Sequence, residues 1–283
     1  MAALRLGAVA SIGALAALSA APALADGMPA RGRVKTVEEA PQRRCTASAN
    51  VGLASEYVFR GLSQTSEGAA IQGGFDLTCG VFYVGVWGSN LDWGPVERAG
   101  PDDTWASLEL DVYAGFKGKA GRFSWDLGVI YYTYPNSTEN HFSDPLGRDF
   151  RNEYVEIKAG ASTDIWKNGT LGVTGYYSPD YQYETGDVWT LEVGFAQAFS
   201  PWFGFTPTIS ALFGHQWGNN GAYFDRVAGD DEYSYWNAGI TFGFLEKWSL
   251  DLRYWDTDLD DGFCSGAYFQ CDERFVGTLK FTF

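Results

Sequence analysis

Apolar and polar residues alternate along most of the chain that follows residue 44. In one stretch Leu127, Val129 and Tyr131 fall on one face, while Asp126 falls on the other. A period of two is typical of a β-strand whose two faces meet different surroundings, whereas a helix would repeat about every 3.6 residues. We predict twelve strands, at Thr46–Arg60, Ala70–Cys79, Phe82–Asp92, Trp105–Lys117, Phe123–Tyr134, Asn152–Ser162, Thr170–Tyr177, Asp187–Phe199, Phe205–Gln216, Tyr233–Leu245, Trp248–Asp256 and Arg274–Phe283.

The connections between these strands alternate between short and long. Two short turns are Cys79–Val81 and Gly118–Arg122. An even strand count returns both chain ends to one side, so the pattern predicts an all-β fold, a transmembrane antiparallel up-and-down barrel with its long loops outside the cell. A soluble β-sandwich could bury the same apolar faces, but it would not favour this alternation. The long loops are Gly61–Ala69, Trp93–Asp103, Pro135–Arg151, Ser178–Gly186, Trp217–Glu232 and Thr257–Glu273.

The first predicted strand shows how the faces are assigned. It places Tyr57 and Phe59 with Val51 on an apolar face, which we expect to contact lipid. Glu56 and Arg60 share the opposite face, which we expect to line the lumen.

Composition supports a membrane barrel. Aromatic residues make up 17% of the chain and include 11 Trp, yet the mean hydropathy is −0.18. A barrel can place these aromatic side chains on its outer face and at the two interfaces between lipid and water. After the first 25 residues, no segment approaches the roughly 18 consecutive apolar residues that a membrane-spanning helix requires.

The N-terminus has the features of a secretory signal. Arg5 precedes the apolar stretch Leu6–Leu18, and Ala23–Ala25 offers a cleavage site with small residues. We expect a signal peptide over residues 1–25, a flexible periplasmic leader over 26–44 and an outer-membrane β-barrel over 45–283. The chain would then reside in the outer membrane of a Gram-negative bacterium, in contact with outer-membrane lipid.

The last residues predict an assembly signal. Phe281 and Phe283 alternate with Lys280 and Thr282 at the end of the chain. An ordinary last strand does not require a terminal Phe, so we expect the barrel-assembly machinery to recognise this end.

The four cysteines suit an oxidising compartment, because an even count in an exported chain favours disulfide pairing. We predict one disulfide between Cys264 and Cys271 across the final long loop. We predict a second between Cys45 and Cys79 at the periplasmic ends of the first two strands, since neighbouring antiparallel strands can bring Cα atoms within the required roughly 4.4–6.8 Å.

Several motifs resemble the TorF family of proteobacterial outer-membrane porins. The resemblance extends from Asn50 to the end of the chain, and the four cysteines and the basic leader depart from the family pattern. It implies an outer-membrane barrel with a pore, and it supplies neither a substrate nor catalytic residues. The matching segments are Asn50–Thr65, Ala70–Asp76, Phe82–Trp93, Tyr132–Pro135 and Asp272–Val276.

The predicted lumen carries both acidic and basic residues. Carboxylates that line a pore favour cations, so an acidic excess predicts a channel for passive diffusion of small solutes with a mild preference for cations. The alternative is a closed structural or adhesive barrel whose lumen is filled by salt bridges, because small barrels are often closed by side chains. The candidate selectivity residues are Glu56, Asp76, Glu109, Asp111, Asp126, Glu156, Glu192 and Asp251 against Arg60, Lys158, Arg253, Arg274 and Lys280.

The formal net charge of −15 makes nucleic acid a poor partner, because polyanions are attracted by basic surfaces. The leader itself is mildly basic, so the lumen field could draw it into the periplasmic mouth as a partial plug. Its basic residues are Arg31, Arg33, Lys35, Arg43 and Arg44, against Asp26, Glu38 and Glu39.

A lipid-modifying enzyme embedded in the membrane is the less favoured class. His215 falls on the apolar face, but the residue two places on is Trp217 and not a serine that could act as nucleophile. The acidic segment from Asp256 to Asp261 lacks the spacing of a calcium loop. We therefore predict no catalytic residue, no metal and no cofactor.

Overall fold

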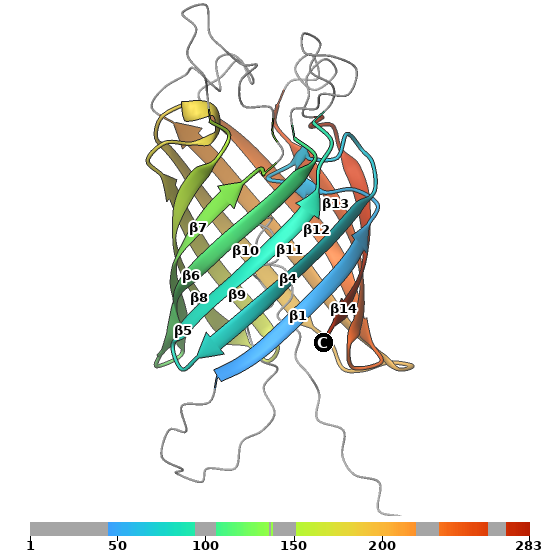
Figure 1. The fold of residues 1–283 in the computed structure, drawn as a ribbon. Coiled ribbons are helices and arrows are strands. Elements are labelled where there is room, and N and C mark those ends of the chain that lie inside the picture. Colours follow the sequence, from blue (N-terminus) through green and yellow to red (C-terminus); the bar gives the residue numbers. More distant parts are fainter. Residues whose placement is uncertain (1–44, 94–105, 136, 138–150, 219–231, 260–269) are drawn as a thin grey trace, which may run out of the picture.

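The computed structural model describes residues 45–93, 106–135, 137, 151–218, 232–259 and 270–283. Twelve antiparallel strands form a closed barrel, as the alternating pattern predicts (Figure 1). The barrel strands are β1 (Cys45–Ala54), β4 (Ala70–Cys79), β5 (Phe82–Asn90), β6 (Leu108–Ala120), β7 (Phe123–Thr133), β8 (Tyr154–Trp166), β9 (Gly169–Ser178), β10 (Val188–Ala198), β11 (Phe205–Gly218), β12 (Glu232–Phe244), β13 (Trp248–Thr257) and β14 (Arg274–Thr282).

The barrel closes between its first and last strands. Val51 on β1 is paired with Phe281 on β14, and each other barrel strand pairs with its neighbours in the sequence. Short turns join the strands at the end where the chain leaves β14 (Figure 1). A closed sheet satisfies every backbone hydrogen bond without an exposed edge, as a membrane requires.

The predicted disulfide between Cys45 and Cys79 is confirmed. The two residues are direct partners in the β1–β4 pairing, with a Cα–Cα distance of 4.2 Å. The second predicted disulfide involves Cys264, which lies outside the described residues, so that pairing stays a prediction.

The outer wall is apolar and carries aromatic rings toward both ends. Leu127, Val129 and Leu191 are exposed on it in the middle of their strands. Toward the short turns, Trp202 and Phe203 are 67% and 83% exposed, which is the exposure expected of side chains at a lipid–water interface. Among the described residues, no helix is long and apolar enough to cross a membrane.

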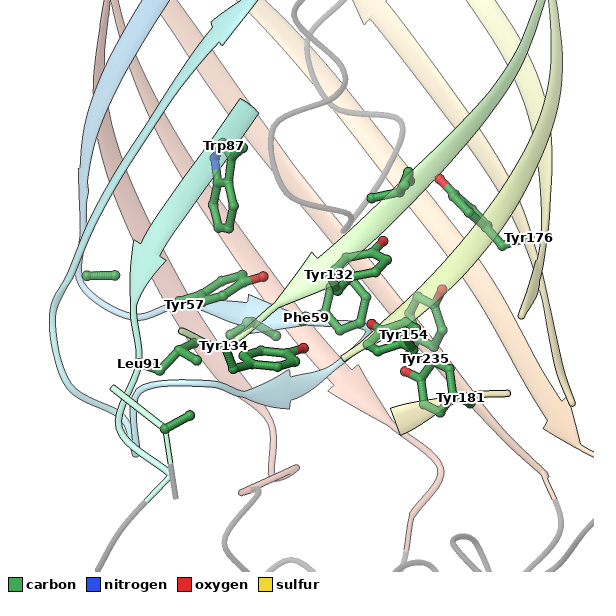
Figure 2. Packing of buried hydrophobic residues seen from close by; sticks show 14 of the residues in the cluster. Tyr57, Phe59, Trp87, Leu91, Tyr132, Tyr134, Tyr154, Tyr176, Tyr181 and Tyr235 are labelled. Carbon is green, nitrogen blue, oxygen red and sulfur yellow. The ribbon is translucent and has the colours of Figure 1, made fainter. Parts of the chain in front are cut away.

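The first long connection does not extend outside the barrel, and this corrects the prediction for residues 55–69. Strand β1 ends at Ala54, and residues 55–69 then fold back as a small hairpin built on β2 (Val58–Phe59) and β3 (Leu62–Ser63). The whole segment 55–69 is called the hairpin below. Most of its side chains are buried within the barrel (Figure 2). Tyr57 and Phe59 are therefore buried and do not contact lipid, contrary to the predicted faces.

The hairpin turn has a local cause. Arg60 and Gly61 have φ angles of 50° and 85°, and two consecutive positive φ angles are the mark of a tight two-residue hairpin turn. Glycine adopts this conformation without strain, whereas arginine does so at a cost that its surroundings must offset.

Candidate functional site in the barrel lumen

The hairpin is held inside the barrel by a buried ion pair. The Arg60 guanidinium donates two hydrogen bonds to the Glu156 carboxylate on β8, at 2.7 and 2.9 Å. Both side chains are 1% exposed. Burial acts to lower the pKa of Arg60, but the Glu156 carboxylate and the neighbouring Tyr181, Tyr235 and Tyr132 together outweigh it, so the pKa lies well above its usual value. Arg60 therefore stays charged, and it links the hairpin to the barrel wall.

Aromatic rings surround this ion pair. The Arg60 guanidinium lies 5.0 Å from the centre of the Tyr176 ring, a separation at which cation–π attraction operates. Tyr132 donates a hydrogen bond to Glu156 at 3.0 Å and its ring stacks on Tyr154 at 4.4 Å. Figure 2 shows these tyrosines gathered around the hairpin within the barrel.

Further contacts fix the two ends of the hairpin. Glu56 forms an ion pair with Arg274 on β14. The Tyr233 hydroxyl donates to the Arg60 carbonyl oxygen at 3.2 Å. At Gly61, an added Cβ would lie 2.3 Å from a methyl carbon of Thr257. The hairpin thus spans the lumen from β8 to β13 and β14 and narrows it at that level.

A second network lies nearer the short turns. Asp126 accepts hydrogen bonds from the Tyr83 hydroxyl at 2.7 Å and from Lys158 at 2.8 Å. Asp76 accepts one from Tyr113 at 2.6 Å. These carboxylates are only partly buried, so this part of the lumen offers charged groups to water.

Arg253 is the centre of a third network on the β13 wall. It donates to both carboxylate oxygens of Asp251, at 3.0 and 2.9 Å. It also donates to Asn237 at 2.7 Å and to Ser210 at 2.9 Å. Asp251 is in turn held by Thr241 at 2.6 Å. The positive charge of Arg253 is therefore balanced locally.

Glu109 and Asp111 differ from these paired groups. They lie two residues apart on the lumen face of β6 and are 3% and 0% exposed. Neither forms an ion pair within the described residues, and both carboxylate oxygens of Asp111 are buried without a hydrogen-bond partner there. Elsewhere Glu192, also buried, accepts a hydrogen bond from Tyr235 at 2.7 Å.

The structure places the thirteen candidate selectivity residues on the inner side of the barrel. Eleven of them lie on barrel strands and face inward because the strand alternation is regular. Lys280 is one of these, on the same face of β14 as Arg274. Glu56 and Arg60 reach the lumen by a different route, through the inward-folded hairpin. Lys117 lies on the same face as Asp111 and was missed because the predicted strand ended there. Its ammonium group lies 5.0 Å from the Tyr83 ring centre.

The surroundings of His215 include a serine that its own strand does not supply. On the outer wall, Ser234 of β12 is its direct partner, with Oγ 3.2 Å from His215 Nδ1. Glu232 lies 3.4 Å from Nε2. The side chains beside His215 thus come from the neighbouring strand β12 and not from its own strand β11. The Ser234 amide donates to the Asp258 carboxylate at 2.7 Å, and a negative charge there opposes an oxyanion at Ser234.

Two further predicted features have a place in the structure. Phe281 packs against Trp248 at 4.9 Å and against Phe283 at 4.8 Å. The Phe283 amide also donates to the Ala49 carbonyl at 2.8 Å, which ties the end of the chain to β1. Within the described residues, no group of three or more His, Cys, Asp or Glu side chains could hold a metal ion.

The chain belongs to a bacterial protein family of unknown function, Gcw_chp, which matches residues 38–283. It is similar to the KdgM porin in complex with disordered oligogalacturonate, with 7% sequence identity, coverage of 84% of this chain and 98% of that chain, and a TM-score of 0.47. For the NanC porin the identity is 9%, the coverage is 84% of this chain and 98% of that chain, and the TM-score is 0.45. For the COG4313 outer membrane channel from Pseudomonas putida F1 the identity is 14%, the coverage is 88% of this chain and 99% of that chain, and the TM-score is 0.44. None of the curated proteins matches the chain.

Proposed function

We propose that the chain is a porin-like channel of the outer membrane, which passes small solutes by passive diffusion through a lumen narrowed by the hairpin of residues 55–69. The observation that carries this proposal is the contrast between the two walls. The outer wall exposes large apolar side chains, whereas the inner wall and the hairpin present paired acids and bases. A charged inner wall is typical of a barrel that contains water.

The remaining sequence predictions fit the same proposal. Residues 1–25 would direct export, 26–44 would form a periplasmic leader, and the end at Phe283 would be recognised during assembly. The resemblance to TorF porins supports a pore. No cofactor is required, because passive diffusion involves no chemical step.

Conductance in planar lipid bilayers tests the proposal. We expect the full-length protein to form channels, and we expect a variant in which Tyr57–Thr65 is replaced by a short Gly-Ser turn to conduct severalfold more. The matched control is Glu232→Gln, which alters a half-exposed carboxylate on the outer wall and should leave conductance unchanged. If neither the wild type nor the shortened variant conducts, the protein is a closed structural barrel and not a channel.

The arrangement of Ser234, His215 and Glu232 requires that hydrolysis be tested as a second candidate function. We expect no activity, because the described residues place the Asp258 carboxylate and no free amide donor at Ser234. Incubation with a fluorophosphonate probe checks this, with Ser234→Ala as the control. Labelling of the wild type that Ser234→Ala abolishes would establish a serine hydrolase on the outer wall.

A further inference from the structure

Glu109 and Asp111 form a pair of buried carboxylates without a neutralising partner in the described residues. Four of the other acidic lumen residues each contact a basic side chain, namely Glu56, Asp126, Glu156 and Asp251. Asp111 is completely buried, with both oxygens unpartnered among the described residues. An uncompensated buried carboxylate costs several kcal/mol, so the site binds either a proton or another positive charge.

A third oxygen points toward the same place. The Tyr57 hydroxyl of the hairpin is buried and has no hydrogen-bond partner in the described part of the chain. Burial, and next the charges of Glu109 and Asp111, raise the pKa of Tyr57. The hairpin therefore presents a neutral phenol oxygen beside two carboxylates.

The surrounding wall is aromatic. Asp111 pairs in register with Trp87 on β5 and with Tyr132 on β7, and direct cross-strand partners have Cβ atoms about 4.5–5.5 Å apart on one face. The Tyr57 ring meets the Trp87 ring edge-on at 5.4 Å (Figure 2). Aromatic faces attract cations that have lost their hydration shell.

These features favour one class of cation. A calcium site needs about six to eight oxygen ligands, more than two carboxylates and one phenol supply. Magnesium keeps several bound waters, and the aromatic rings beside this site offer those waters no oxygen acceptors. An ammonium group needs only a few acceptors for its N–H bonds, and its carbon substituents suit aromatic rings.

We propose that Glu109, Asp111 and Tyr57, enclosed by Trp87 and Tyr132, form a binding site for the ammonium group of a small organic cation. The proposal deepens the channel function, since it assigns small amines as solutes that the lumen holds. This proposal rests on the channel function in one respect, because solutes must be able to enter the lumen.

Binding is measured separately from conduction, so that the two proposals can fail independently. Isothermal titration calorimetry on the full-length protein in nonionic detergent, at constant ionic strength, uses methylammonium chloride as the probe and sodium chloride as the comparison. A charge-assisted hydrogen bond contributes about 1.5–3 kcal/mol, so we expect Glu109→Gln and Asp111→Asn each to weaken methylammonium binding at least about tenfold. The matched control is Glu232→Gln, which changes a carboxylate on the outer wall and should bind as the wild type does.

A second measurement separates loss of the site from loss of the fold. Asp111→Asn removes an unpaired buried charge, so its thermal unfolding midpoint without amine should equal or exceed that of the wild type. Methylammonium should raise the midpoint of the wild type and not that of Asp111→Asn. Equal binding of sodium and methylammonium, or equal stabilisation of wild type and Asp111→Asn, would overturn the proposal.

Discussion

The contact between Arg60 and Glu156 joins two residues 96 positions apart in the sequence. Removing one member of a buried ion pair leaves an uncompensated charge, which costs about 3–5 kcal/mol. We therefore expect Glu156→Leu to lower the free energy of unfolding by that amount, measured by urea unfolding in phospholipid vesicles. Glu232→Gln, at a half-exposed outer carboxylate, should change it by less than about 0.5 kcal/mol.

A double substitution distinguishes the charge from the packing. Replacing both partners, as in Arg60→Met with Glu156→Leu, leaves no unpaired charge, and such replacements are often neutral. The double variant should thus be more stable than Glu156→Leu alone. If the two losses simply add, the ion pair does not hold the hairpin.

Residue faces were largely predictable, whereas residue partners were not. Strand alternation placed Glu156 and Arg253 in the lumen, because the side-chain period of two is fixed by the backbone. It could not show that Arg60 reaches Glu156, or that Ser234 faces His215, since both contacts depend on the register between separate strands and on a turn of the chain. Pairing of β11 with β12 is what aligns His215 with Ser234.

At the scale of elements, the hairpin depends on a close approach at Gly61. An added Cβ there would meet Thr257 at 2.3 Å, and Gly61 has a φ of 85°. Gly204 offers a matched control, because its φ is 83° but no atom lies within 4 Å of an added Cβ. Overpacking costs about 1–3 kcal/mol, so we expect Gly61→Ala to be less stable than Gly204→Ala by about that amount in urea unfolding. Equal stability would show that the hairpin tolerates displacement.

The disulfide between Cys45 and Cys79 anchors the ends of β1 and β4. It closes a segment with a sequence separation of 34 that contains the whole hairpin. A cross-link of this kind typically contributes about 2–4 kcal/mol. The Cys45→Ser, Cys79→Ser double variant should lose about that much stability relative to the wild type in urea unfolding, with both proteins measured without reductant. Equal stability of the two proteins would show that this cross-link contributes nothing.

The inward fold of residues 55–69 is the element that the sequence did not predict. The alternate positions from Val51 to Phe59 are apolar except at Ser55, so the period alone extends the strand to Arg60. Length was a partial signal, because the predicted strand had 15 residues against the roughly 9–11 that a spanning strand needs, but β11 stays in the wall with 14 residues. The excess residues and the Arg60–Gly61 turn together mark a segment that leaves the wall.

On the scale of the whole molecule, the lumen charges are not uniformly distributed. The half that contains the hairpin carries five acidic residues against Arg60 and Arg274, namely Glu56, Glu109, Asp111, Glu156 and Glu192. The half nearer the short turns carries Asp76, Asp126 and Asp251 against Lys117, Lys158, Arg253 and Lys280. With Lys117 included, eight acids face six bases, so the acidic excess is smaller than the sequence predicted.

This distribution predicts a mild cation preference that originates at the hairpin. Low-dielectric walls focus the field of the unpaired carboxylates, so cations should be enriched there relative to anions. Reversal potentials under a salt gradient measure the preference, first for the mature chain from Asp26 and then for a chain that begins at Cys45 and lacks the basic leader. We expect cation preference in both, and a larger conductance without the leader if it occupies the periplasmic mouth. Anion preference in both chains would refute the selectivity, and equal conductance would show that the leader is not a plug.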